Sequence, residues 1–149
     1  MVTKLDYYYM SLAMNVAKMS HGVRSKVGCC IVTDNDVTIL SCNGLPKRLG
    51  NVLEYTDDNG LLVTKPTVIH AEHNGIIKCA KEGVVVKGAS AYITLSTCVH
   101  CASALASSGV KKVVYLEEYR DPSGIEVLKE CGILTYQIDR KEMEKYLNG

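Results

Sequence analysis

ASAYITLSTCVHCASALASSGVKKVVYL, residues 89–116, contains two β-rich runs with a helical pattern between them. Residues 89–95 predict a buried strand, because apolar, aromatic and β-branched side chains follow one another there. Residues 98–108 predict a helix that ends at Gly109, and residues 112–116 predict a second short strand. A strand, a helix and a strand in this order predict a crossover between parallel strands of one sheet.

The same alternation continues toward the C-terminus. Residues 121–131 predict a helix that ends at Gly132, residues 133–138 predict a last strand, and residues 139–148 predict a polar terminal helix. The second half of the sheet is therefore expected to be largely parallel.

The N-terminal part predicts an antiparallel start to the sheet. Apolar residues recur at helical spacing over residues 3–20, where Thr3 can cap the first turn. Residues 27–33 and 37–42 predict two strands, and the Asp-Asn-Asp turn at 34–36 favours a hairpin between them. The sheet is therefore expected to be mixed.

The remaining residues complete the expected fold. Residues 68–81 predict a helix that ends at Gly83, and residues 43–67 predict the longest irregular segment, with one short strand at 61–63. Long loops in compact domains are often functional. Together the patterns predict a single domain over residues 1–149, a three-layer α/β/α sandwich around a mixed five-stranded sheet.

Composition argues against several classes of protein. The chain has 17 basic and 16 acidic side chains, a net charge of +1 and 47% hydrophobic residues, which is typical of a globular protein. A nucleic-acid-binding surface usually carries a larger positive excess. No apolar run is long enough to span a membrane, and no apolar signal core precedes the first helix. We therefore expect a cytoplasmic protein whose seven cysteines are thiols and metal ligands rather than disulfides.

Two short motifs predict a metal site. His70-Ala71-Glu72 and, 28 positions later, Cys98-x-x-Cys101 supply one imidazole and two thiolates, a ligand set suited to Zn²⁺. Three protein ligands leave the fourth tetrahedral position for water, as in catalytic zinc sites. Zinc lowers the pKa of such a water to about 7, and Glu72 is placed to carry protons between the water and a substrate. Each motif is expected at the N-terminus of a helix, so that both helices converge on one ion.

Other interpretations of the Cys-x-x-Cys motif are weaker. Alone it is compatible with a redox pair or with half of a structural zinc site. A four-ligand structural site needs a second closely spaced pair. The other cysteines do not provide one, because Cys29 and Cys30 are adjacent and the rest are isolated. The two motifs in this order therefore favour a hydrolytic zinc enzyme.

The chain resembles the zinc-dependent cytidine/deoxycytidylate deaminase superfamily, whose signature is His-x-Glu followed by Pro-Cys-x-x-Cys. Within that superfamily it is most similar to the deoxycytidylate (dCMP) deaminases. The resemblance covers residues 5–138 and includes VGCCIV at 27–32, SCNGLP at 41–46, HAEHNGI at 70–76, AYITLSTC at 91–98 and SGVKKVVY at 108–115. It implies a cytidine deaminase-like fold, Zn²⁺ bound by His70, Cys98 and Cys101, and Glu72 as the proton carrier to N3 of cytosine and to the leaving amino group.

Further residues are expected to bind the substrate. By resemblance, Asn43 contacts the sugar, the backbone N–H of Ala71 binds the cytosine O2, and Tyr119 lies where relatives close the pocket. Arg24, Lys26, Lys47 and Arg48 are candidates to neutralise a 5′-phosphate, because charged donors bind phosphate strongly. For each of these residues an ordinary turn or surface role is the competing interpretation.

The sequence departs from the family pattern at three places. Thr97 replaces the Pro before the first Cys, which removes a rigid residue but leaves both ligands. His73 replaces the usual Leu after His-Ala-Glu, and we expect it in the pocket or at an interface rather than on the metal. Residues 41–44 lack the family's Tyr in a segment that contributes to a nucleoside triphosphate site in relatives, which weakens the expectation of regulation.

The resemblance implies hydrolysis of dCMP to dUMP and ammonia, which supplies dUMP for thymidylate synthesis. The alternatives are the same chemistry on dCTP, a modified cytosine nucleotide, cytidine or tRNA adenosine, and more remotely an inactive zinc-binding regulatory module. The expected partners are a nucleotide substrate and copies of the same chain, with a hexamer favoured, and dCTP or dTTP with Mg²⁺ as candidate effectors. No membrane or nucleic-acid partner is expected.

Overall fold

The computed structural model describes residues 1–149 and contains a central five-stranded sheet with the strand order β2-β1-β5-β6-β7. Its strands are β1 (Gly28–Val32), β2 (Thr38–Cys42), β5 (Ser90–Leu95), β6 (Lys112–Glu117) and β7 (Leu134–Gln137). β1 pairs antiparallel with β2 and with β5, whereas β5–β6 and β6–β7 are parallel. The expected mixed sheet, antiparallel at its start and parallel in its second half, is confirmed.

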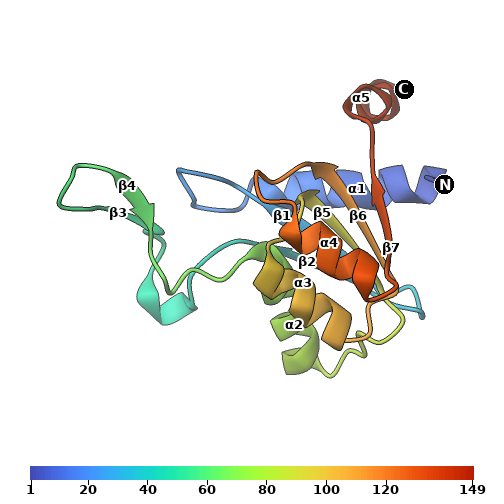
Figure 1. Cartoon of the computed structure of the whole chain (residues 1–149), viewed down its shortest axis with the longest axis horizontal. Coiled ribbons are helices and arrows are strands. Elements are labelled where there is room, and N and C mark those ends of the chain that lie inside the picture. The colour runs from blue at the N-terminus through green and yellow to red at the C-terminus, as the bar shows by residue number, and fades with distance from the viewer.

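Helices cover both faces of this sheet (Figure 1). They are α1 (Lys4–Ala17), α2 (Ala71–Glu82), α3 (Val99–Ser107), α4 (Ser123–Glu130) and α5 (Arg140–Asn148), with a short 3₁₀ helix η1 (Lys47–Leu49). One core cluster joins the sheet to α2, α3 and α4, and a second joins the opposite face to α1 and α5. The three-layer α/β/α prediction is therefore confirmed.

Two helices differ from the prediction by three residues at one end. α1 ends at Ala17 rather than at residue 20, because the next residues form tighter turns and the Ser20 hydroxyl donates to the carbonyl of Asn43. α2 begins at Ala71 rather than at residue 68, because the N–H and C=O of Ile69 bond to Gly44 across a β-bridge. This bridge keeps the residues before Ala71 extended, so His70 caps the helix instead of lying within it.

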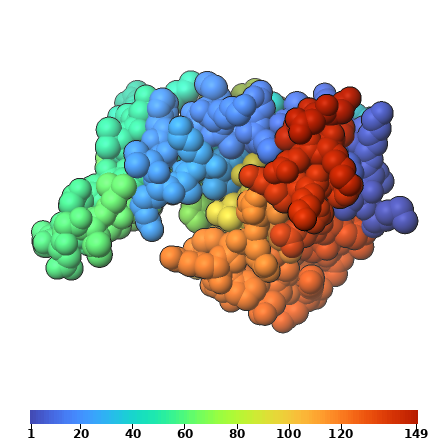
Figure 2. All heavy atoms as spheres, turned by 90° about the horizontal axis from the view of Figure 1, so that it is seen from above, coloured from blue at the N-terminus to red at the C-terminus, as the bar shows by residue number.

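The long segment predicted as irregular contains a second, two-stranded sheet. β4 (Leu62–Thr64) corresponds to the short strand expected at 61–63, whereas its partner β3 (Glu54–Thr56) was not predicted. β3 is only three residues long and is set by its pairing with β4, so it has no alternating pattern of its own. The β3–β4 hairpin extends away from the sandwich, as the green arm in Figures 1 and 2 shows.

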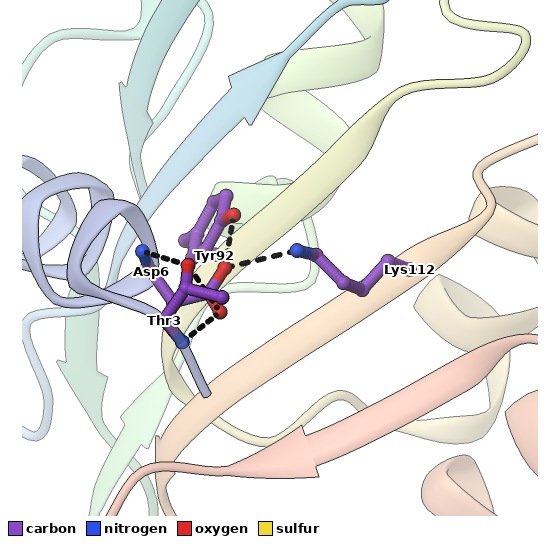
Figure 3. Close-up of polar contacts among 4 residues, drawn as sticks. All are labelled: Thr3, Asp6, Tyr92 and Lys112. Carbon is purple, nitrogen blue, oxygen red and sulfur yellow. Dashed lines mark hydrogen bonds and ion pairs between the residues drawn. The ribbon is translucent and has the colours of Figure 1, made fainter. Parts of the chain in front are cut away.

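The face of the sheet that carries α1 contains a buried charge network (Figure 3). Asp6, which is 1% exposed, accepts hydrogen bonds from Tyr92 Oη at 2.7 Å and from Lys112 Nζ at 2.9 Å. Its second oxygen accepts the Thr3 N–H at 2.7 Å, completing the capping box of α1. Burial acts to raise the pKa of Asp6, but these donors outweigh it and lower the pKa below its usual value. The network ties the first turn of α1 to β5 and β6.

Two further expectations concern the cysteines and the membrane. All seven cysteines are free thiols, as predicted. No helix combines the length and the apolar character needed to cross a bilayer.

Candidate active site

The two motifs lie at the starts of neighbouring helices on one face of the sheet. His70 is the N-cap of α2 and Cys98 is the N-cap of α3, both with extended backbone. Cys101 lies in the first turn of α3, and its N–H donates to the Cys98 sulfur at 3.5 Å. The prediction that two helix N-termini meet at one point is confirmed.

The side chains of His70, Cys98 and Cys101 have the spacing of a zinc site. Their ligand atoms lie within 4.8 Å of one another. The Nδ1 atom of His70 is 3.6 Å from the sulfur of Cys98 and 3.4 Å from that of Cys101. Tetrahedral zinc, with bonds of about 2.3 Å to sulfur and 2.0–2.1 Å to nitrogen, places such atoms about 3.6 Å apart. The two distances from His70 to the cysteine sulfurs therefore match those of a tetrahedral zinc site.

Burial makes a bound cation a requirement for the ionisation of Cys101. This thiol is 1% exposed, and its burial raises its pKa far above the usual value, with the nearby Glu72 and Cys98 adding to the effect. The position at a helix N-terminus is therefore insufficient to ionise Cys101. A metal ion supplies the positive charge that converts a coordinating thiol to its thiolate.

Hydrogen bonds to β2 fix the start of α2. The Ser41 hydroxyl donates to the carbonyl of Ala71 at 2.7 Å, and the Asn74 amide donates to the carbonyl of Cys42 at 2.8 Å. These bonds hold the first turn of α2, in which Glu72 is 4% exposed, against the sheet. The predicted ligand His70 and the predicted proton carrier Glu72 therefore both lie at the start of α2, which these bonds hold in place.

Thr97 and His73, two departures from the family pattern, both lie near the ligands. Thr97 is 1% exposed, and its hydroxyl donates to the carbonyl of the next residue, Cys98, at 3.3 Å. The Nδ1 atom of His73 lies 3.8 Å from the Cys101 sulfur, but His73 is not part of the three-residue ligand group.

A cavity of about 430 Å³ opens over the ligands. Its walls come from the loops before β1, after β2, after β5 and after β6, and from the base of the β3–β4 hairpin. The lining residues are Arg24, Ser25, Val27, Asn43, Leu53, Glu54, Thr64, Val68, His70, Ala71, Glu72, Leu95, Ser96, Cys98, Glu118, Tyr119 and Arg120.

Four of the predicted substrate-binding residues line this cavity, namely Arg24, Asn43, Ala71 and Tyr119. Lys26, Lys47 and Arg48 do not. Lys26 lines an adjacent hollow between α1, β6 and the start of α5. The segment that precedes β1 therefore directs its two predicted cations toward different depressions of the surface.

The side chain of Asn43 also supports the cavity wall. Its Oδ1 atom accepts the N–H of Val27 at 2.9 Å, and its Nδ2 atom donates to the carbonyl of Ser25 at 3.0 Å. A primary amide has two donor hydrogens and two acceptor lone pairs, so one of each stays available. Asn43 can therefore hold the loop and still meet a ligand.

Sequence reasoning missed six polar residues of the cavity, namely Ser25, Glu54, Thr64, Ser96, Glu118 and Arg120. Arg120 directly follows Tyr119, and its guanidinium carbon lies 5.7 Å from the centre of that ring. Because Tyr119 was already expected at the pocket, the adjacent Arg120 could have been predicted there as well. Glu54 and Thr64 belong to the hairpin that the sequence did not predict as a pair of strands, so nothing in the sequence placed them together.

Comparison with known proteins identifies the family. Residues 3–117 match the model of the cytidine and deoxycytidylate deaminase zinc-binding region. The deoxycytidylate deaminase of Enterobacteria phage T4 is 28% identical, over 91% of this chain and 91% of the relative, and that of Mycobacterium phage D29 is 31% identical, over 76% and 94%.

A solved structure gives the same result. The dCMP deaminase from the cyanophage S-TIM5, in complex with dCMP and dUMP, superposes with a TM-score of 0.84 at 33% identity, over 93% of this chain and 99% of that chain. His70, Cys98 and Cys101 lie in position to hold the zinc ion for which the family model is named. The chain therefore belongs to the zinc-binding cytidine and deoxycytidylate deaminase family, a family of hydrolytic deaminases.

Proposed function

We propose that this chain hydrolyses dCMP to dUMP and ammonia, and that it thereby supplies dUMP for thymidylate synthesis. One observation carries the proposal: two of the three metal ligands, His70 and Cys98, line the same cavity as Glu72 and two arginines, Arg24 and Arg120. A cytosine at the ligands and a 5′-phosphate at the arginines would use both groups. The phage relatives named as deoxycytidylate deaminases, and the related structure with dCMP and dUMP, support this substrate.

His70, Cys98 and Cys101 would hold Zn²⁺, which when bound acidifies a coordinated water to a pKa of about 7. Glu72 would take a proton from the attacking water and deliver it to N3 of cytosine, which makes C4 more electrophilic. The water oxygen would bond to C4, and Glu72 would move the remaining proton of that oxygen to the amino group. The C4–N bond would then break, so that ammonia departs and the oxygen remains as the C4 carbonyl of uracil. One positioned carboxylate can act as base and then as acid in this way.

The remaining cavity residues would orient the nucleotide. Ala71 lies in the first turn of α2, where backbone N–H groups have no acceptor within the helix, so its N–H can bind the cytosine O2. Asn43 would offer its remaining donor and acceptor to the sugar. Tyr119, whose N–H donates to the Ser96 hydroxyl at 2.6 Å, would close the pocket at the end of β6.

Arg24 and Arg120 would bind the 5′-phosphate, for which arginine is well suited because its planar guanidinium offers several donors. Lys26 is adjacent in sequence but lines the neighbouring hollow, so its contribution to phosphate binding would be long-range.

The test is a comparison of substrates with the zinc-loaded protein. Conversion of dCMP, dCTP and deoxycytidine is followed side by side by the ultraviolet change from cytosine to uracil. We expect dCMP to have the highest kcat/KM. Equal rates on all three would show that the arginines do not select a substrate with a 5′-phosphate. No turnover of dCMP by zinc-bound protein would refute the proposal and move the search to dCTP, modified cytosines and RNA.

We further propose that the chain acts in the cytoplasm as a homo-oligomer, with a hexamer favoured. Large apolar side chains exposed on α1 and on the β3–β4 hairpin support association; they include Leu5, Tyr8, Tyr55, Leu61 and Leu62. Light scattering coupled to gel filtration measures the oligomer. Assays with dCTP or dTTP and Mg²⁺ test these nucleotides as effectors, for which the loss of the family's Tyr from residues 41–44 predicts a weak response.

A further inference from the structure

The base of the β3–β4 hairpin contacts the segment that carries Arg24. Glu54 on β3 and Thr64 on β4 are direct partners in the hairpin register, at the end nearest the sandwich. Directly opposed residues of an antiparallel pair lie on the same face of the sheet. Both side chains line the active-site cavity, although the rest of the hairpin extends away from it (Figure 1).

Glu54 holds the backbone of the Arg24 segment. One of its carboxylate oxygens, Oε2, accepts the N–H of Val23 at 2.8 Å and the N–H of Arg24 at 2.9 Å. Glu54 is only 8% exposed, and hydrogen bonds from donors to a charged acceptor are stronger than those between neutral groups. The carboxylate therefore fixes the direction in which the Arg24 side chain leaves the chain.

Thr64 holds the other end of the same residue. A guanidinium nitrogen of Arg24, Nη1, donates to the Thr64 hydroxyl at 3.2 Å. Arg24 is thus bound at its backbone by one hairpin strand and at its side chain by the other, although 30 and 40 positions separate it from these partners.

These contacts matter because Arg24 is otherwise an exposed residue on a loop. Confining an arginine side chain costs rotamer entropy, and a ligand that has to impose this order binds more weakly. We infer that Glu54 and Thr64 position Arg24, and that the β3–β4 hairpin thereby sets the preference for a substrate that carries a 5′-phosphate. This inference rests on the proposed deamination of dCMP.

The experiment measures kcat/KM for dCMP and for deoxycytidine in zinc-loaded variants. Relative to wild type, we expect the ratio of the two values to fall about 30-fold in R24A, about tenfold in E54A and about threefold in T64A, because each removes a hydrogen bond to or from a charged group. The loss should appear in KM for dCMP. T56A is the matched control, because Thr56 lies on the same hairpin but does not line the cavity.

Conservative variants and a double mutant separate positioning from a general loss of structure. E54Q keeps an oxygen that can accept both N–H groups, and T64S keeps the hydroxyl. Both variants should therefore keep most of the wild-type ratio of kcat/KM for dCMP to kcat/KM for deoxycytidine. If Glu54 acts through Arg24, the E54A/R24A double mutant should be no worse than R24A alone. These variants also cover the case in which E54A folds poorly.

The outcomes distinguish this inference from the proposed function. Failure of the zinc-loaded wild type to deaminate dCMP overturns both. If wild type prefers dCMP but E54A, E54Q and T64A lower kcat/KM equally for dCMP and deoxycytidine, only the positioning role is overturned. Additive losses in the double mutant would likewise overturn it, because Glu54 would then act independently of Arg24.

Discussion

The Nδ1 atom of His70 lies 3.4 Å from the sulfur of Cys101, although 31 positions separate the two residues. The contact joins the first turns of α2 and α3, which cover the same face of the sheet. A metal ion at this point therefore connects two helices as well as serving the chemistry, and its loss should be visible in stability.

Removal of zinc should lower the melting temperature by roughly 8–16 °C. A ligand present at about 1,000 times its Kd stabilises the folded state by about 4 kcal/mol, and each kcal/mol shifts the melting temperature of a chain of this size by about 2–4 °C. Differential scanning calorimetry before and after chelation, and after zinc is restored, measures the shift.

The C101A variant should have a low melting temperature that added zinc does not raise. Wild type should bind about one zinc ion per chain, and C101A less than a tenth of that amount. C131A is the control, since Cys131 is an exposed thiol outside the ligand group. Equal zinc content in C101A and wild type would contradict the assignment of Cys101 as a ligand.

The E72Q variant should keep its zinc but lose at least about 10³-fold in kcat. Gln has nearly the shape of Glu, so the buried turn at the start of α2 is preserved, but it cannot accept and return a proton, a function that contributes about 10²–10⁴-fold. Steady-state deamination of dCMP together with metal analysis checks both parts. Near-normal turnover would show that another group carries the protons.

The R120A variant should lower kcat/KM for dCMP by about 10- to 100-fold, because a hydrogen bond between charged groups contributes about 1.5–3 kcal/mol. The loss should shrink as salt is added, as expected for an ionic contact. R48A is the matched control, since Arg48 lies in η1 and does not line the cavity. Identical losses in R120A and R48A would indicate a general effect of positive charge.

The sequence predicted the succession of strands and helices along the chain, and the metal ligands, for one reason. Both depend on local patterns: alternating strand and helix signals in the second half, and ligands placed where helices begin. His70 and the two cysteines needed no knowledge of distant contacts, because each motif marks its own helix start. Only the spatial distance between His70 and the two cysteines could not be predicted without the fold.

The missed features depend on contacts between distant residues. The early end of α1 depends on the contact of Ser20 with Asn43, and the late start of α2 depends on the bridge between Gly44 and Ile69. The position of Glu54 likewise depends on a hairpin that pairs only three residues on each strand. No window of sequence contains both partners of these contacts in a recognisable pattern.

The D6N variant tests the buried network on the other face of the sheet. It should lower the free energy of unfolding at pH 7 by about 2–4 kcal/mol, because it removes the charge that Lys112 neutralises and leaves buried donors without a full partner. D34N is the matched control: the Asp34–Lys111 pair is 60% exposed on both sides, and such pairs contribute about 0–1 kcal/mol. Urea unfolding of the three proteins measures these differences.

The effect of D6N should also depend on pH in a defined direction. The pKa of Asp6 is lowered in the folded state, so its ionised form stabilises the folded protein more than its protonated form does. The stabilisation is present in full above the unfolded-state pKa of about 3.9, and it is lost as pH falls through the lower folded-state value. The difference between wild type and D6N should therefore be constant from about pH 7 to pH 5 and shrink below about pH 4. A difference that grows with acid would mean that Asp6 is protonated in the folded protein, and that the contacts of Tyr92 and Lys112 do not hold its charge.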